Sequence, residues 1–264
     1  MRALLLAAGV GSRLRPLTEH LPKCLVPIRG RPLLDYWLEL LLGGGVSEVL
    51  VNAHHHADVV NAFVAACPRA RQVKVVRETQ LLGTAGTVLR NKAFLQGGPF
   101  LVGHADNLTV FAPQEFIQAH AGRPRGTELT MMTFTTPDPR SCGVVQLDRQ
   151  GVVRIFQEKV PAPVGNTANA AVYVVESSVI SYLESLGKDI IDFSTEVLPH
   201  YVGRTFTFHN EDYHRDIGTL ESLRDAQIDF PLPVGAWANA YWREIMERDN
   251  GELRKQIERL LATS

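Results

Sequence analysis

Short apolar runs alternate with stretches of helical periodicity between residues 1 and 110, and this alternation is what most limits the possible folds. The apolar runs of strand length are Ala3–Ala7, Val49–Asn52, Val73–Arg77 and Phe100–Gly103. The helical stretches between them are Leu33–Leu42, Val59–Ala66 and Ala85–Leu95. Strands joined by helical crossovers pair in parallel, and nearly continuous apolar strands are typical of sheets covered on both faces. The sequence therefore predicts an α/β fold with a Rossmann-like, mainly parallel sheet flanked by helices.

The pattern changes from about Thr127 onward, where strand candidates follow one another with short turns. They are Leu129–Thr135, Val144–Leu147, Val152–Phe156 and Ala171–Val175. Helical stretches return at Val179–Leu186 and Ser194–Tyr201. We therefore expect a mixed extension of the sheet that forms the second half of the functional site.

A further helix is predicted over Glu252–Leu261 in the tail of the chain. Its large apolar side chains share one face, and they are Leu253, Ile257, Leu260 and Leu261. Such a face is suited to packing on its own domain or on a second subunit. The sequence is therefore compatible with a monomer and with a homodimer.

The charge balance limits the possible partners. The chain has 264 residues, with 27 Lys and Arg against 28 Asp and Glu. This balance provides no basic surface for a nucleic-acid backbone, so neither DNA nor RNA is expected as a partner. No stretch approaches the roughly 20 apolar residues of a membrane helix. Cys24, Cys67 and Cys142 have no metal-ligand or disulfide spacing, which favours reduced thiols and a cytoplasmic protein.

A glycine-rich segment follows the first apolar run directly. Ala8-Gly9-Val10-Gly11-Ser12-Arg13 places two glycines where a backbone can approach a phosphate closely. The spacing of a P-loop is absent, and Leu14 stands where a dinucleotide fingerprint requires its third glycine. What remains is Gly-x-Gly-x-Arg, whose guanidinium is suited to gripping phosphate oxygens.

Pro22-Lys23 follows ten residues later and leads into Leu25-Val26-Pro27-Ile28. The whole stretch from Leu5 to Ile28 closely resembles the signature of the sugar-1-phosphate nucleotidylyltransferases, and the resemblance continues to about Ile228. It implies the nucleotide-diphospho-sugar transferase fold and transfer of a nucleoside monophosphate from an NTP to a sugar 1-phosphate. It further implies a catalytic domain at residues 1–228, with a nucleotide half to about 110 and a sugar-phosphate half from 111. Residues 229–264 would then form a C-terminal helical extension.

The resemblance implies the following roles at the phosphate end. Arg13 would neutralise the β and γ phosphates that leave as pyrophosphate, and Lys23 would bridge phosphates in the active site. Asp106 and Asp216 would hold Mg²⁺, because hard oxygen ligands suit a hard cation. Asp106 follows His104-Ala105, where the family has Asn-Gly, so its local loop contacts are in question. The rest of the nucleotide site would be Leu6, Ala8, Gly9, Gly11, Ser12, Glu78, Gly83 and Thr84.

For the sugar phosphate, Phe156-Gln157-Glu158-Lys159 resembles the family's F-x-E-K element. Glu158 would bind sugar hydroxyls and Lys159 would contact the phosphate of the sugar, as a catalytic residue. Gly143 and Asn169 match residues that contact the sugar.

Leu82-Gly83-Thr84-Ala85-Gly86 resembles the mannose-1-phosphate guanylyltransferases more than the uridylyl or thymidylyl branches. A carboxylate at Glu78 is able to accept hydrogen bonds from both guanine N1–H and the guanine amino group. Two other interpretations remain open: Glu78 exposed at a strand end, or base choice set by backbone near Gly83. We expect GTP and mannose 1-phosphate, with UTP, dTTP or CTP and heptose, glucose or amino-sugar 1-phosphates as alternatives.

Two alternative functions were considered. A dinucleotide-dependent oxidoreductase is disfavoured by Leu14 and by the lack of a suitable acidic residue after the next strand. A non-catalytic subunit that senses nucleotides or sugars would be expected to have lost part of the phosphate or metal site. The consecutive histidines His54-His55-His56 favour a loop or helix start at the rim of the site over a metal centre, because neighbouring side chains point in different directions.

Overall fold

The computed structural model describes residues 1–232 and 239–262. Within these residues, nine strands form one sheet with the path β10-β9-β11-β6-β1-β4-β5, and β8 and β12 extend it alongside β11. The parallel part comprises β1 (Arg2–Leu6), β4 (Glu48–Ala53), β5 (Val73–Arg77) and β6 (Phe100–His104). The predicted mixed α/β fold is confirmed.

Helices cover both faces of the parallel strands, and the sequence of β1 shows why. Ala3 and Leu5 belong to one hydrophobic core, whereas Leu4 and Leu6 belong to the other. Side chains along a strand alternate between faces, so an unbroken apolar strand must be covered twice. The first core contains α1 (Leu33–Gly43) and α2 (Ala57–Ala65), and the second contains α3 (Gly83–Arg90) and α6 (Ser178–Ser185).

The second half of the sheet is mostly antiparallel. It contains β8 (Leu129–Thr135), β9 (Gly143–Leu147), β10 (Val153–Glu158), β11 (Thr167–Val175) and β12 (Thr205–His209). Strand β11 joins the two halves, because it pairs with β6 through residues 172–175 and with both β8 and β9. Its register shifts between Asn169 and Tyr173, where Ala171 has a positive φ of 54°.

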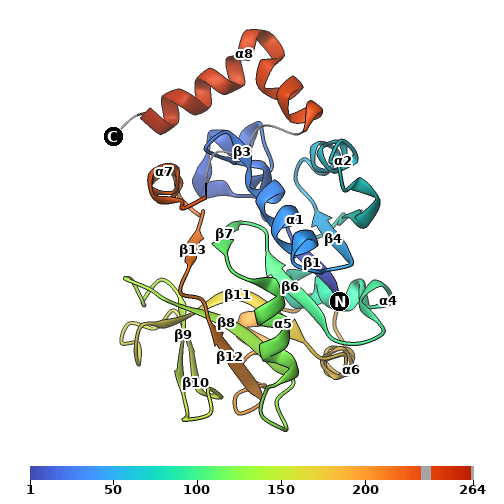
Figure 1. The fold of residues 1–264 in the computed structure, drawn as a ribbon, viewed down its shortest axis with the longest axis vertical. Coiled ribbons are helices and arrows are strands. Elements are labelled where there is room, and N and C mark those ends of the chain that lie inside the picture. Colours follow the sequence, from blue (N-terminus) through green and yellow to red (C-terminus); the bar gives the residue numbers. More distant parts are fainter. Residues whose placement is uncertain (233–238, 263–264) are drawn as a thin grey trace.

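A separate two-stranded ribbon crosses from one half to the other (Figure 1). Its strands are β7 (Asn107–Val110) and β13 (Tyr213–Asp216), and Asp216 pairs with Asn107. The sequence patterns predicted neither strand, nor α5 (Pro113–Ala121) nor β12. The helix expected over Ala85–Leu95 is divided at Asn91 into α3 and α4 (Lys92–Leu95), and Ser194–Tyr201 begins as a π-helical turn over Phe193–Val197.

The C-terminal helix α8 (Ala240–Ala262) lies across one end of the molecule, beside α7 (Leu220–Asp229) and the hairpin of β2 (Pro27–Ile28) and β3 (Arg31–Pro32) (Figure 1). Trp242 and Ile257 are buried in the first core, and Leu253, Leu260 and Leu261 pack against it. The apolar face of the predicted tail helix therefore packs on its own chain. Residues 233–238 and 263–264 of the predicted extension lie outside the described residues.

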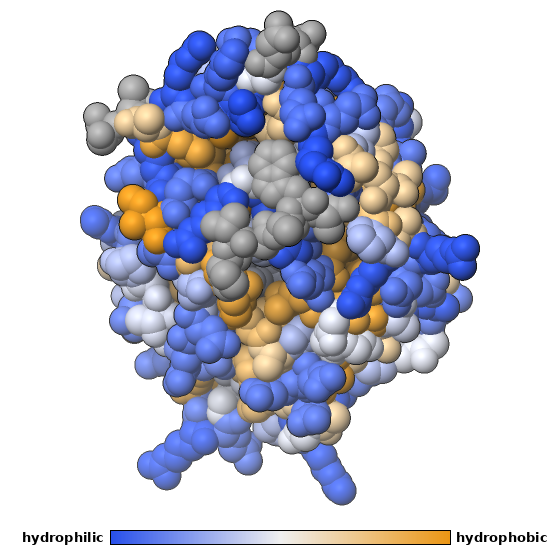
Figure 2. All heavy atoms as spheres, turned by 45° about the horizontal axis from the view of Figure 1, so that its top comes forward, coloured by the Kyte–Doolittle hydropathy of each residue, from blue (hydrophilic) through white to orange (hydrophobic). Residues whose placement is uncertain are grey.

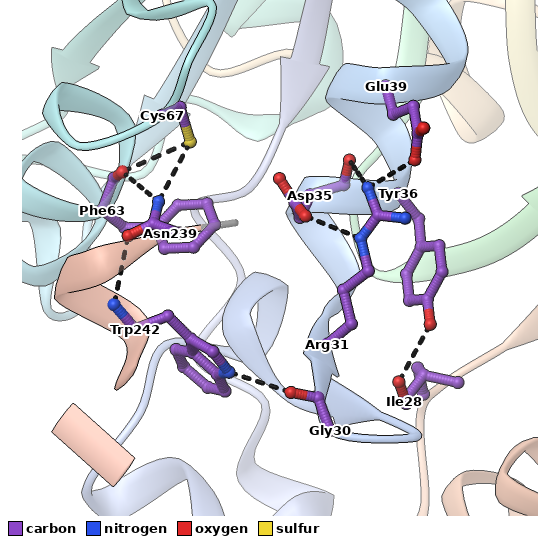
Figure 3. Close-up of polar contacts among 10 residues, drawn as sticks. All are labelled: Ile28, Gly30, Arg31, Asp35, Tyr36, Glu39, Phe63, Cys67, Asn239 and Trp242. Carbon is purple, nitrogen blue, oxygen red and sulfur yellow. Dashed lines mark hydrogen bonds and ion pairs between the residues drawn. The ribbon is translucent and has the colours of Figure 1, made fainter. Parts of the chain in front are cut away.

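Hydrogen bonds also attach the start of α8 to α2 and to the turn at Gly30. Asn239 donates to Phe63 O at 2.9 Å and caps Trp242 N, while Trp242 Nε1 donates to Gly30 O at 2.9 Å (Figure 3). With this end turned forward, the visible surface is largely hydrophilic, with hydrophobic patches near its centre (Figure 2). No helix within residues 1–232 and 239–262 is long and apolar enough to span a membrane. All three cysteines are free.

Candidate active site

The glycine-rich loop leaves β1 at the carboxyl edge of the parallel strands, where ligands bind in open α/β sheets. Gly11 has a φ of 66°, and a Cβ there would lie 2.9 Å from Thr18 Cγ2. The hydroxyl of Thr18 donates to Gly11 O at 2.8 Å and closes the loop from the inside. Gly9 and Ser12 are exposed, so the outer side of the loop is open to a ligand.

Lys23 lies at the centre of a charged cluster beside this loop. Its Nζ is 2.7 Å from Asp106 Oδ2 and 3.5 Å from Asp216 Oδ1, and only 8% of its side chain is exposed. Arg13 approaches Asp216 to 4.0 Å from the solvent side. The four residues assigned to phosphates and metal therefore meet at one place, although they come from positions 13 to 216 of the chain.

The two aspartates meet because of the β7–β13 ribbon. Asp106 immediately precedes β7, and Asp216 ends β13. Ile217 N donates to Asp106 O at 3.1 Å, which joins the two loops directly. Gly218 leaves room for the cluster, because a Cβ there would lie 2.7 Å from Asp216 Oδ2 and 2.9 Å from Arg13 Nη2.

The departure His104-Ala105 does not displace Asp106. Ala105 N donates to Leu6 O at 3.0 Å, as a continuation of the β1–β6 pairing. Trp37 Nε1 donates to Asn107 O at 2.7 Å, and Asn107 Nδ2 donates to Ala170 O at 3.2 Å. These contacts hold the backbone on both sides of Asp106, and the sequence analysis did not identify Trp37 or Asn107.

Electrostatic effects favour the ionised form of Asp106. Desolvation alone would raise the pKa of Asp106, but the ammonium of Lys23, His104 and hydrogen bonds outweigh it, so this pKa lies below its usual value. Burial lowers the pKa of His214 to about 3. The His214 ring packs against Phe134 at a tilt of 44°, with 4.3 Å between centroids, and among the described residues its Nδ1 has no hydrogen-bond partner. His214 is therefore a neutral packing residue beside the aspartates.

Glu78 follows β5 and is buried, with 6% exposed, which contradicts the interpretation that it is merely exposed at a strand end. Its Oε1 accepts a hydrogen bond of 2.6 Å from Thr87 Oγ1, and its amide donates to Ala53 O at 2.8 Å. His54 Nδ1 lies 2.8 Å from Glu78 O. The carboxylate is thus fixed in one orientation at the edge of the sheet.

Gly83 and Thr84, assigned to the nucleotide, join the first half of the chain to the second. A Cβ at Gly83 would lie 2.5 Å from Ile191 O, so only glycine permits this close approach. Thr84 Oγ1 accepts a hydrogen bond of 2.7 Å from Phe193 N and lies 3.3 Å from Asp192 Oδ2. The hydroxyl of Thr84 is therefore already engaged within the protein.

The sugar-side residues lie on β9, β10 and β11. Gly143 pairs with Glu158, and a Cβ at Gly143 would lie 2.5 Å from Glu158 Oε2. Lys159 has a φ of 48°, its Nζ is 3.7 Å from Glu158 Oε1, and 64% of its side chain is exposed. Asn169 Nδ2 donates to Tyr173 OH at 2.7 Å, while Asn169 Oδ1 accepts from Ala171 N.

Asp192 is a further acidic residue of this region that the sequence analysis missed. Burial raises the pKa of Glu158, and the charge of Asp192 adds to this effect, so the two carboxylates lie within electrostatic reach of each other. Asp192 caps the π-helical turn by accepting from Thr195 N at 2.8 Å. An Asp directly before the first apolar residue of a helical stretch, as Asp192 is before Phe193, is an N-cap signal in the sequence.

Comparison with known proteins identifies the family. The family model described as nucleotidyl transferase matches residues 2–231. The chain belongs to this family. Mannose-1-phosphate guanylyltransferase 1 of Arabidopsis thaliana is 33% identical over 190 residues, which cover 70% of this chain and 52% of that protein. The mannose-1-phosphate guanyltransferase of Emericella nidulans is 31% identical over 226 residues, 83% of this chain and 61% of that protein.

The chain thus spans about half the length of the first curated relatives that it matches. Solved structures share the family fold. A Bacillus anthracis protein in complex with sucrose has a TM-score of 0.80 at 18% identity, covering 92% of this chain and 99% of that one. HddC of Yersinia pseudotuberculosis has a TM-score of 0.72 at 24% identity, covering 87% and 99%. These two structures support the family fold alone.

Proposed function

We propose that this protein transfers a nucleoside monophosphate from an NTP to a sugar 1-phosphate and releases pyrophosphate, with GTP and mannose 1-phosphate as the favoured pair. The observation that carries the proposal is the buried Lys23 ammonium between Asp106 and Asp216, beside the open glycine-rich loop. Membership of the nucleotidyl transferase family supports the reaction class. Mannose-1-phosphate guanylyltransferases among the relatives support the substrate pair.

In this reaction an oxygen of the sugar phosphate attacks the α-phosphorus, and the bond from that phosphorus to the pyrophosphate oxygen breaks. Both reactants are anions, so alignment and charge neutralisation supply most of the catalysis. Arg13 would neutralise the departing β and γ phosphates, and Lys23 would contact phosphate at the reacting centre. Lys159 would hold the phosphate of the sugar. No group has to remove a proton from the nucleophile.

The residues present fit Mg²⁺. Asp106 and Asp216 offer carboxylate oxygens on one side of the loop, and both already contact a cation, Lys23. When bound, the ion would offset negative charge on the α-phosphate and the attacking oxygen. The side chains of both aspartates are partly exposed, at 32% and 57%, so the carboxylates are accessible to an ion that enters with the nucleotide.

Base and sugar would be recognised at opposite ends of the site. Glu78 Oε1 is held by Thr87, which fixes the plane of the carboxylate for the paired donors of guanine. Leu6, Ala8 and Gly83 would surround the nucleotide near β1 and α3. Glu158 would accept hydrogen bonds from sugar hydroxyls, with Gly143 and Asn169 beside it.

The test is pyrophosphate release from a matrix of GTP, UTP, dTTP, CTP and ATP against mannose, heptose, glucose and amino-sugar 1-phosphates. We expect turnover that requires Mg²⁺, is abolished by EDTA, and is fastest with GTP and mannose 1-phosphate. A preference of about tenfold for UTP or dTTP over GTP would contradict the base assignment, because one hydrogen-bonding contact to the base readily supplies that much discrimination. Absence of turnover with every pair would contradict the proposed activity and favour a non-catalytic sensing role.

A further inference from the structure

A single glutamine clasps the hairpin that follows Lys23. The hairpin consists of β2 (Pro27–Ile28) and β3 (Arg31–Pro32), and its turn is formed by Arg29 and Gly30. Gln227 on α7 accepts a hydrogen bond of 2.6 Å from Arg29 N through Oε1. Through Nε2, Gln227 donates to Pro27 O at 3.0 Å. Both ends of one side-chain amide therefore bind the backbone of the hairpin.

Arg29 makes hydrogen bonds in the opposite direction, from the hairpin to α7, and we call Gln227 and Arg29 together the clasp. Its guanidinium donates to Gln227 O at 3.0 Å, Ile228 O at 2.8 Å and Leu232 O at 3.2 Å. The first two are among the last carbonyls of α7, which lack partners within the helix and attract a positive charge. Arg29 also has a φ of 48°, a strained conformation for a residue with a Cβ that persists only where surrounding contacts impose it.

Each of the two segments that the clasp joins carries a charged residue of the candidate active site: Lys23 precedes the hairpin, and Asp216 precedes α7. Lys23 begins a short helical turn that leads into the hairpin, where Val26 N donates to Lys23 O at 3.1 Å. Asp216 ends the strand that leads into α7, and the hydroxyl of Ser222 donates to Asp216 O. A few residues of chain therefore connect Lys23 to the hairpin and Asp216 to α7, the two elements that the clasp joins.

We infer that Gln227 and Arg29 are positioning residues that set the spacing between Lys23 and Asp216, an inference that rests on the proposed nucleotidyl transfer. Lys23 and Asp216 are 3.5 Å apart and belong to segments separated by almost 200 positions. Such alignment is sensitive, because displacement of a reacting group by about 1 Å costs up to about a hundredfold in rate. Neither Gln227 nor Arg29 is among the residues assigned to the nucleotide, the metal or the sugar phosphate, so the clasp acts through Lys23 and Asp216.

The same hairpin has two further attachments that do not run through Gln227. Trp242 Nε1 on α8 donates to Gly30 O at 2.9 Å, and Tyr36 OH on α1 donates to Ile28 O at 3.0 Å (Figure 3). Trp242→Phe removes one hydrogen bond from the hairpin and keeps an aromatic ring in the core. It is therefore a matched control for Gln227→Leu.

The experiment compares Gln227→Leu, Arg29→Gly and Trp242→Phe with the unmodified protein. Glycine at position 29 tolerates the positive φ, so this variant removes the guanidinium without adding strain. We expect all three to lower the melting temperature by a few degrees. Gln227→Leu and Arg29→Gly should lower kcat about tenfold with a smaller change in KM, whereas Trp242→Phe should keep kcat within about twofold.

Hydrogen exchange gives a readout that does not depend on activity. Gln227→Leu and Arg29→Gly should speed exchange in peptides that contain Val26 and Asp216, and Trp242→Phe should leave the Asp216 peptide unchanged. Equal kcat and equal exchange at Asp216 in all three variants would overturn the clasp. An unmodified protein that releases no pyrophosphate would overturn the proposed function instead, while the exchange pattern would still decide on the clasp.

Discussion

Two lysines assigned to phosphates lie in contrasting environments at the two ends of the candidate site. Lys23 is 8% exposed and lies 2.7 Å from Asp106, whereas Lys159 is 64% exposed and lies 3.7 Å from Glu158. Charges interact more strongly where water is excluded, so the Lys23 cluster is preorganised. The Lys159 side chain is instead free to adjust when a ligand binds. The comparison indicates a rigid phosphate end and an adaptable sugar end.

The contrast extends to the neighbouring backbone. The loops around Asp106 and Asp216 are joined by the β7–β13 ribbon, and the segments of Lys23 and Asp216 are joined by the clasp at Gln227. Lys159 follows the last residue of β10, an edge strand of the sheet, and Lys159 N donates to Cys142 O at 3.2 Å. A rigid phosphate end suits charge neutralisation, which every substrate of the family requires. An adaptable sugar end suits selection among sugars.

The largest expected effect is on Lys23. Lys23→Met should reduce kcat about a thousandfold, the upper range for loss of one preorganised charge-stabilising group. Single-turnover pyrophosphate release by variant and unmodified protein gives the ratio. Lys92→Met is the control, because Lys92 pairs with Glu184 on the surface. Retention of a third of the activity in Lys23→Met would contradict a rigid, essential phosphate end.

Asp106→Ala and Asp216→Ala should each reduce Mg²⁺-dependent turnover by at least about a hundredfold, since loss of an outer-shell partner of a metal ligand already costs 10- to 100-fold. A titration of turnover against Mg²⁺ concentration checks this. Asp212→Ala, an exposed residue between β12 and β13, is the acidic control. Near-normal turnover in both aspartate variants would refute the metal assignment.

At the sugar end, Lys159→Ala should raise the KM for the sugar phosphate about tenfold with a smaller loss in kcat. The reason is that the exposed Lys159 ammonium would contribute mainly to binding the phosphate of the sugar. Steady-state kinetics with saturating NTP provide the two constants. An effect on kcat as large as that of Lys23→Met would abolish the distinction between the two ends. Arg154→Ala is the control, because Arg154 lies on β10, the strand that leads to Lys159, and pairs with Asp148.

Glu78→Gln should shift the ratio of kcat/KM for GTP over UTP about tenfold toward UTP, because an amide matches the alternating donors and acceptors of uracil. Thr87→Val should shift it in the same direction by less, since it only frees the carboxylate from its hydrogen bond of 2.6 Å. Competition between the two nucleotides measures the ratio directly. An unchanged ratio in Glu78→Gln would assign base choice to backbone near Gly83.

The smallest expected effect concerns stability, in a buried ionic network of the sugar half outside the site. His120 is buried and contacts Thr130 Oγ1 and Glu176, and Arg123 pairs with the same glutamate. Desolvation and the charge of Arg123 lower the pKa of His120. Below pH 6.5, His120 is therefore protonated in the unfolded chain but stays neutral in the folded chain. The free energy of unfolding then decreases by at most about 1.4 kcal/mol for each unit by which the pH is lowered.

His120→Gln removes this contribution. The free energy of unfolding, measured with urea at several pH values from 5 to 8, should fall less steeply with acidification in the variant. Identical slopes for His120→Gln and the unmodified protein would show that His120 has the same pKa in both states.

The sequence predicted the strands of the parallel half closely, including β5 at Val73–Arg77, because buried strands there are uninterrupted apolar runs. It failed at β7 and β13, which are four residues long each: Asn-Leu-Thr-Val is too short for its alternation to be distinctive, and Tyr-His-Arg-Asp has no apolar alternation. These strands exist because they pair with each other across more than 100 positions, and no local pattern records such pairing.

The site shows a similar division. Arg13, Lys23, Asp106 and Asp216 were identified in the sequence because each lies within a recognisable motif, and the structure brings them together. Their roles, and the role of Mg²⁺, stay predictions. Trp37, Asn107, Asp192 and Gln227 escaped identification, since single polar residues acquire a role only through partners distant in the chain.

The sequence by itself determined the α/β class, the glycine-rich loop after the first strand and the family, because periodicity and motif spacing are local properties. Only the tertiary structure decided that the Lys23 ammonium is buried between two carboxylates while Lys159 remains exposed. It also decided that α8 packs on its own chain and that Gln227 joins the Lys23 and Asp216 segments. The physical reason is that burial and charge separation depend on distances between segments far apart in the chain.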